Sequence, residues 1–477
     1  MSYRIPNNPF SNGLKYLRKL RTENRARLIE KRRRLNDLNA LSDTQNQEIT
    51  AGLAVISQGD INVGCSMIHS VIATRNVQIP VQLQTEILKR LNEVNQIITV
   101  EWVLELLHDL SMCLDDTLVS LLVSTRLFQI LKENCFQTSN VNRLVLSLNT
   151  MALILQNRQN LRDEFLSPQQ LLQIQSICAF GLTTESADIF KAIGSFLAAV
   201  AHNLPPIRED VAMLVYSLSL TYFEQSFGDV MAIFLIVIKN TTKNFPKVIE
   251  SALSNGVMQT FVNVIMYDNE KCKVRAIKLL RSWCGQTDEI WNSMDSAVFV
   301  IFSIVECSES QTVFEALKFL GIVSSSSVYA QRLLNVVVSN RKHLLFFESV
   351  LSGSCLPLCF GAIDVLSNVF YWSGDSKGLP QFVRDLCNCQ IAEAIAKCFQ
   401  KDELCEHQET FKKLVCITKS IFETVATEKW PTPNPIDIFE SINGQIMMPR
   451  NLRLDQGLCH LVARVNLYME NKEVLLP

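Results

Sequence analysis

The sequence predicts an all-α fold in which helical repeats stack into a solenoid, and three observations lead to it. Hydrophobic residues make up 48% of the 477 residues, which supplies enough apolar material for an extended core. Glycine and proline are scarce, with 16 and 14 residues, so few residues remain to build the tight turns of a β-rich fold. The third observation is a helical segment that recurs along most of the chain.

The recurrent unit consists of a short helix-like stretch, a longer helix and a few polar residues. Its clearest last helices read KAIGSFLAAVAHN from Lys191, RAIKLLRSWCGQTDE from Arg275, EALKFLGIVSSS from Glu315 and GAIDVLSNVFYWSGD from Gly361. Equivalent positions in seven such helices are Glu105, Val145, Gly194, Ala232, Lys278, Lys318 and Asp364. Their mean spacing is about 43 residues, within the range of about 40 to 47 that is typical of armadillo and HEAT arrays. We therefore expect a right-handed armadillo-repeat solenoid of about ten repeats.

Within one unit the apolar residues recur at helical spacing. In the copy around Leu320 the stripe consists of Val313, Leu317, Leu320 and Val323, widened by Ala316 and Phe319. One such helix cannot bury its apolar face alone, so the neighbouring units must cover it. The competing interpretation is a globular α domain of unrelated helices. It predicts no constant spacing between equivalent positions.

Charge and pattern divide the chain into three segments. We expect residues 1–44 to form a flexible basic arm, residues 45–430 to form the repeats, and residues 431–477 to form a loop with a partial C-terminal repeat. Residues 1–40 contain eleven Lys and Arg against three Asp and Glu, a net charge of +8. Since the whole chain carries −2, the remaining residues carry −10. A basic arm thus precedes an acidic body.

Four interpretations of the arm stay open from its composition. It can be a solvated tail, a nuclear-localisation or RNA-binding patch, a helix on a lipid surface, or a docking helix for an acidic protein groove. Aromatic residues such as Phe10 and Tyr16 are too few to favour base stacking. No lipidation motif is present, and the leucines form no wide stripe. The tail and the docking helix are therefore favoured equally.

Other classes of protein are disfavoured by missing signals. The longest strongly apolar run, from Val230 to Ile238, is too short to span a bilayer. The N-terminus lacks the apolar core of a secretory signal, so we expect the 15 cysteines to be free thiols. No C-x-x-C pair and none of the usual catalytic or phosphate-binding motifs occurs. We expect no enzyme, no cofactor and no metal site.

Several segments carry a resemblance to one family. In the arm these are Phe10, the pair Asn12-Gly13, Arg21-x-Glu23, Lys31, Arg34 and Leu38. In the body they are EITAGLAVISQGD from Glu48, SNGVMQTFVNVI from Ser254, CGQTDE after Trp283 and IDIFESING from Ile436. Asn255-Gly256 would supply the left-handed turn between two helices. Over nearly its whole length the sequence resembles the importin-alpha (karyopherin-alpha) family.

The resemblance also shows where the chain departs from the family. Third helices of that family present Trp-x-x-x-Asn on the concave face, where the two side chains hold a basic import-signal peptide. The Trp positions here are Glu105, Val145, Gly194, Lys318 and Asp364, and the Asn positions are Asp109, Asn149, Ala198, Ile322 and Asn368. No Trp and two Asn remain, and Leu153 stands where the family has an acid that pairs with the main lysine.

The resemblance implies a nuclear transport adaptor that links cargo to importin-beta and shuttles between cytoplasm and nucleus. The arm residues implied to bind importin-beta are Arg18, Arg21, Lys31, Arg32, Arg33 and Arg34. The residues implied for a degenerate cargo groove are Glu105, Asp109, Asn149, Asp364 and Asn368. The acids would attract a basic peptide weakly, Lys318 would repel one, and the two asparagines can equally be ordinary surface residues.

The expected partners are importin-beta and protein cargo with an import signal, which need not be of the classical type. We expect no membrane insertion and no direct binding of nucleic acid. The alternative is an armadillo scaffold without transport activity, in which the arm is a localisation signal or a self-masking segment. Binding of importin-beta to residues 1–40 separates these two functions.

Overall fold

The computed structural model describes most of the chain beyond residue 40. The described residues are 41–75, 79–93, 100–111, 116–136, 140–155, 158–164, 166, 168–184, 186–202, 207–287, 289–305, 310–326, 329–373, 378–427, 434–449, 452 and 455–471. The arm residues Arg18, Arg21 and Lys31 to Arg34 therefore lie outside the described part. All regular elements within that part are helices, and they divide into two compact units, Met1–Val248 and Ile249–Pro477.

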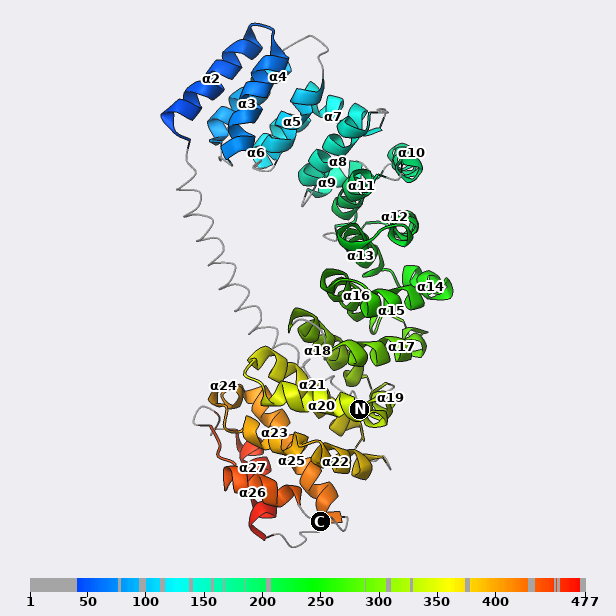
Figure 1. The fold of residues 1–477 in the computed structure, drawn as a ribbon, viewed down its shortest axis with the longest axis vertical. Coiled ribbons are helices and arrows are strands. Elements are labelled where there is room, and N and C mark those ends of the chain that lie inside the picture. Colours follow the sequence, from blue (N-terminus) through cyan, green and yellow to red (C-terminus); the bar gives the residue numbers. More distant parts are fainter. Residues whose placement is uncertain are drawn as a thin grey trace. The chain divides into compact units, whose positions relative to one another are not determined.

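The first unit is built from two rows of helices that pack against each other (Figure 1). In one row each helix packs on the next, and we call this row the first ladder. It contains α3 (Ile61–Arg75), α5 (Val100–Ser111), α8 (Val141–Leu155), α11 (Ala187–Val200) and α13 (Gly228–Thr242). The backing row contains α4 (Val81–Glu93), α6 (Asp116–Val123), α7 (Arg126–Phe136), α10 (Pro168–Thr184) and α12 (Glu209–Glu224). Two further helices, α2 (Asp43–Ser57) and α9 (Gln159–Glu164), pack on α3 and α8.

The second unit repeats this arrangement. Its ladder, the second ladder, contains α16 (Glu270–Trp283), α18 (Ser310–Ser325), α21 (Leu356–Ser373), α25 (Gln408–Thr427) and α27 (Gln456–Asn471). The other helices are α15 (Val257–Tyr267), α17 (Glu289–Ile304), α19 (Ala330–Ser339), α20 (Arg341–Ser352), α22 (Leu379–Asn388), α23 (Ile391–Cys398), α24 (Asp402–Cys405) and α26 (Pro435–Asn443). Helix α14 (Pro246–Ser254) contains the boundary between the two units.

The predicted repeat frame coincides with the ladders. Each of the seven equivalent positions, from Glu105 to Asp364, lies on a different ladder helix. Many hydrogen bonds between successive repeats join residues about one period apart, for example 40 residues for His69 and Asp109 and 49 for Asp364 and Lys413. The prediction of an all-α helical-repeat solenoid is confirmed.

Local sequence signals explain the ends of several helices. Helix α2 begins at Asp43, just before the expected start of the repeats, because Ser42 and Gln45 form a reciprocal capping box. Gly256 adopts φ 73° and ψ 14° between α14 and α15, so the predicted left-handed turn is confirmed. Burial also follows the predicted stripe, since Leu317, Leu320 and Val323 are at most 1% exposed.

The described residues show neither a membrane span nor a metal cluster. None of the described helices combines the length and apolar character that crossing a membrane requires. No three His, Cys, Asp or Glu side chains in the described part are arranged to hold a metal ion. The described cysteines are free thiols.

A buried tyrosine illustrates how adjacent repeats are joined, and it gives a first prediction. The hydroxyl of Tyr222 on α12 donates a hydrogen bond of 2.5 Å to the carbonyl of Cys178 on α10, while its ring stacks on Phe234. Tyr222→Phe keeps the ring and removes the hydrogen bond, so we expect the free energy of unfolding to fall by about 1 kcal/mol in urea denaturation. Tyr222→Ala should cost about 3 kcal/mol or more, because it also leaves a cavity. Equal losses in the two variants would contradict the expectation that the ring contributes to stability beyond the hydrogen bond.

Candidate functional site

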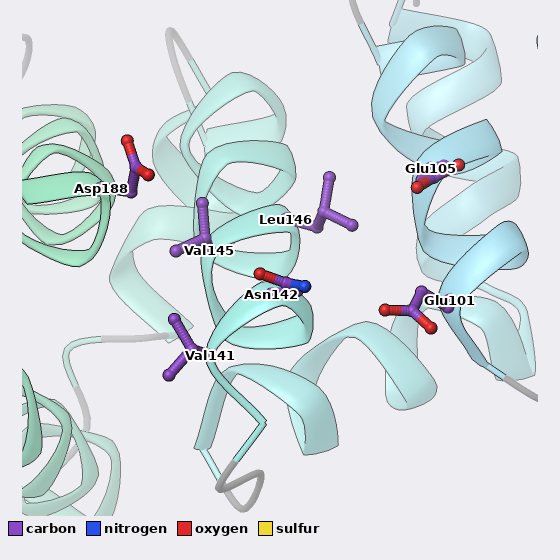
Figure 2. Close-up of a pocket in the computed structure, with 7 residues that line it drawn as sticks. All are labelled: Glu101, Glu105, Val141, Asn142, Val145, Leu146 and Asp188. Carbon is purple, nitrogen blue, oxygen red and sulfur yellow. The ribbon is translucent and has the colours of Figure 1, made fainter. Parts of the chain in front are cut away.

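The first ladder contains a hollow of about 220 Å³ between α5, α8 and α11. Its lining consists of Glu101, Glu105, Val141, Asn142, Val145, Leu146 and Asp188. Figure 2 shows the two glutamates of α5 on one side of the α8 side chains and Asp188 of α11 on the other. The hollow thus combines an aliphatic surface from α8 with carboxylates from both neighbouring helices.

Helical spacing explains why these side chains meet. Glu101 and Glu105 are four residues apart on α5, as are Val141 and Val145 on α8, so each pair lies on one face of its helix. Because α5, α8 and α11 are successive ladder helices, their equivalent faces lie next to one another. Asp188 lies in the first turn of α11, where the helix dipole favours a carboxylate.

A histidine from the preceding ladder helix binds the acids of α5. His69 Nδ1 on α3 lies 2.6 Å from Asp109 Oδ2, and its Nε2 lies 3.6 Å from Glu105 Oε2. Trp102 packs near the same imidazole, with ring centroids 5.9 Å apart. Asp109 therefore ties α5 to α3, whereas Glu105 is shared between His69 and the hollow.

A second histidine lies on the same helix and adds no charge to the hollow near neutral pH. His108 Nδ1 lies 3.3 Å from the hydroxyl of Thr150 on α8. Burial lowers the pKa of His108 below its usual value, outweighing the opposite effect of Asp109. The imidazole is thus neutral at pH 7 and does not cancel the negative charge of Glu101, Glu105 and Asp188.

Close helix packing restricts the side chain that can stand at Gly194, a position where the resemblance would place a tryptophan. At Gly194 of α11 a Cβ atom would lie 2.9 Å from Ile233 Cγ2 and 3.2 Å from a ring carbon of Phe234, both on α13. A side chain at this position would require Ile233 or Phe234 to shift, so a tryptophan does not fit here without rearrangement of these neighbours on α13.

The structure places the five predicted groove residues in different environments. Glu105 lines the hollow, Asp109 binds His69, and Asn149 lies half-buried one turn beyond Val145, outside the residues that line the hollow. In the second unit Asp364 Oδ1 lies 2.6 Å from Lys413 Nζ on the next ladder helix. Asn368 Nδ2 donates hydrogen bonds to the carbonyl of Gly321 and to Ser324 Oγ, both on α18. These two side chains tie neighbouring helices together.

The sequence prediction missed most of the residues that line the hollow. The prediction considered the seven equivalent positions and the residues four places after them. The hollow instead extends one turn toward the N-terminus of each helix. Glu101 and Val141 stand four residues before Glu105 and Val145, so a search in both directions would have found them. Asp188 follows no such rule, because its place depends on the offset between α8 and α11.

Comparisons with known proteins support the fold and nothing finer. No protein family matches the chain, and no curated protein matches it in sequence. Among solved structures, an engineered helical-repeat protein matches with a TM-score of 0.60 and 13% identity, over 90% of this chain and 96% of that one. An armadillo-like structure, from a study of a phosphorylation switch between cadherin and beta-catenin, matches with a TM-score of 0.57 and 12% identity, over 88% and 82%. The chain is thus similar to helical-repeat, armadillo-type structures.

Proposed function

We propose that this chain is a divergent adaptor of the importin-alpha type, which holds protein cargo on its ladder and links it to importin-beta through the basic arm. The observation that carries the proposal is the hollow of the first ladder, with Glu101, Glu105 and Asp188 around an aliphatic surface. This combination suits a lysine or arginine side chain of a bound peptide. The adaptor would shuttle between cytoplasm and nucleus.

The chemistry of the hollow matches both parts of a basic side chain. The methylene stem would lie against Val141, Val145 and Leu146, and the charged end would meet the carboxylates at either side. Aliphatic residues offer no cation–π attraction, which in the family comes from the tryptophans and amounts to about 0.5 to 1 kcal/mol per contact. We therefore expect a classical lysine-rich signal to bind with a dissociation constant on the order of tens of micromolar or weaker.

The test uses the full chain with Arg18, Arg21, Lys31, Arg32, Arg33 and Arg34 changed to glutamine, here called the arm-neutral chain. This background lowers the net charge of residues 1–40 from +8 to +2, so that the arm competes less for the acidic hollow. A fluorescein-labelled, lysine-rich peptide is titrated in an anisotropy assay against it. Glu101→Gln with Asp188→Asn should weaken binding about tenfold, because two partly exposed charge pairs of about 0.7 kcal/mol each are lost.

A matched control separates the hollow from the overall charge. Glu133 on α7 and Asp210 on α12 are exposed on the backing row, away from the hollow. Glu133→Gln with Asp210→Asn changes the net charge equally and should leave the affinity within about twofold. A similar loss in both double variants, or low-micromolar binding that neither affects, would refute the role of the hollow.

The alternative, an armadillo scaffold without transport activity, is favoured by one observation. Asp364 and Asn368, two of the groove residues implied by the resemblance, are engaged in contacts between ladder helices. A scaffold would still bind a basic segment at the hollow, so the peptide assay does not separate the two functions. Binding of importin-beta by the arm does.

A further inference from the structure

The hollow of the first ladder has a titratable neighbour on the preceding ladder helix. His69 lies on α3, and its Nε2 is 3.6 Å from Glu105 Oε2 on α5. Its Nδ1 is 2.6 Å from Asp109 Oδ2. The side chains of His69 and Glu105 are 27% and 30% exposed, so protons from solvent reach both. Because Glu105 also lines the hollow, a change of charge on His69 acts directly at the candidate peptide site.

The charged partners of His69 both lie on α5, and they are Glu105 and Asp109. Helix α2 also packs on α3, and its charged residues are Asp43 and Glu48. Neither of these two forms an ion pair with His69 in the part of the chain that the structure describes. The two carboxylates of α5 therefore decide what a charge on His69 does.

Protonation of His69 would change the charge that the hollow offers to a peptide. An imidazolium has two N–H donors and a positive charge, so it would pair with both carboxylates of α5. A neutral ring has one donor and no charge, which leaves the negative charge of Glu105 available to the hollow. A basic side chain in the hollow and a proton on His69 thus compete for the same carboxylate, so each weakens the binding of the other.

We propose that His69 makes peptide binding at the hollow depend on pH, with a basic segment held more tightly when the imidazole is neutral. The inference rests on the proposed function, because it concerns the same site, and it adds how binding there is regulated. Imidazole is the side chain whose charge ordinarily changes between about pH 5 and pH 8. Ordinary carboxyl groups titrate near about pH 4, so they contribute little to a change in that range.

The second histidine near the hollow, His108, does not produce the same effect. Burial lowers the pKa of His108 below its usual value, so its protonation is confined to more acidic solutions. Its Nδ1 lies 3.3 Å from the hydroxyl of Thr150, which is not one of the residues that line the hollow. His108 is also present in every chain that is tested, so its contribution cancels when variants of His69 are compared with their parent.

The test titrates a lysine-rich peptide against the arm-neutral full chain at about pH 6 and about pH 8.5. The peptide carries rhodamine in place of fluorescein, because fluorescein itself titrates in this range. Anisotropy should show binding about threefold weaker at the lower pH, the effect of one partly exposed charge pair. His69→Gln keeps a polar side chain beside Asp109 without a charge. It should bind with the tighter affinity at both pH values, within about 1.5-fold.

Two further variants make the result specific to the charge of His69. His69→Arg places a permanent cation beside Glu105, so it should bind weakly at both pH values. It also keeps the test decisive if His69→Gln lowers the melting temperature. His202 lies just beyond α11, about 20 Å along that helix from Asp188. His202→Gln should keep the threefold change of the parent, because salt screens charges at that distance.

The outcomes distinguish this inference from the proposed function. Binding that is equal at the two pH values would overturn the inference and leave the role of the hollow intact. A pH dependence that His69→Gln retains, or that His202→Gln abolishes, would also overturn it. Absence of binding at both pH values would refute the proposed function and this inference with it.

Discussion

Replacement of Leu320 by aspartate is expected to unfold much of the second unit. Leu320 lies on α18, which packs between α16 and α21, and its side chain is 0% exposed. An ionised carboxylate at this position has no partner and would cost several kcal/mol. Stacked repeats derive their stability from contacts with their neighbours, so the loss at one ladder helix weakens both adjacent interfaces. The measurement is the helical circular dichroism signal during thermal and urea unfolding.

A control on the same helix distinguishes burial from charge. Gln311 is exposed near the start of α18, where a carboxylate also suits the helix dipole. Gln311→Asp should therefore change the free energy of unfolding by no more than about 0.5 kcal/mol. A Leu320→Asp variant with the melting temperature of the parent chain would contradict the packing of α18 in the ladder.

The repeat frame could be predicted from the sequence because burial on a helix leaves a local pattern. Leu317, Leu320 and Val323 recur at helical spacing, and all three are buried as the pattern indicates. Each unit cannot bury its own face, so the pattern also predicts that neighbouring units stack. Neither inference requires knowledge of how far one helix is shifted along its axis relative to the next.

Contacts between repeats could not be predicted, because they depend on that offset. The spacing on α21 shows that Asp364 and Asn368 share a face. The resemblance implied a groove role for Asp364, and for Asn368 a groove role or an ordinary surface position. In the structure Asp364 pairs with Lys413 on α25, and the amide of Asn368 donates to α18. These partners lie 49 and 47 residues away, and no motif in a single sequence connects them.

The same reason explains which part of the candidate site was found. Glu105 was identified because it occupies a frame position, and the structure places it in the hollow. Asp188 was missed, since its approach to the hollow depends on how α11 packs on α8. The resemblance placed Gly194 at a tryptophan position of the family pattern. The structure was required to show that a Cβ atom there would come within 2.9 Å of Ile233 and 3.2 Å of Phe234.

Replacement of Lys31, Arg32, Arg33 and Arg34 by alanine is expected to abolish most binding to importin-beta. If the arm docks as the resemblance implies, the variant removes four charge-assisted contacts of about 1.5 to 3 kcal/mol each. Contributions of adjacent residues do not add fully. Even half of the additive lower limit, about 3 kcal/mol, corresponds to a loss of more than about a hundredfold in affinity. Titration of purified importin-beta at physiological salt measures this loss.

The control for this prediction removes the same charge from the body of the chain. Arg208, Lys247 and Lys397 have side chains 64%, 77% and 51% exposed, and Lys342 is also exposed. Their joint replacement by alanine should leave the affinity for importin-beta within about threefold, because long-range attraction between exposed charges is screened by salt. If the arm variant binds as tightly as the parent chain, the transport function fails. The hollow would then be assigned to a scaffold, since its residues do not include the arm.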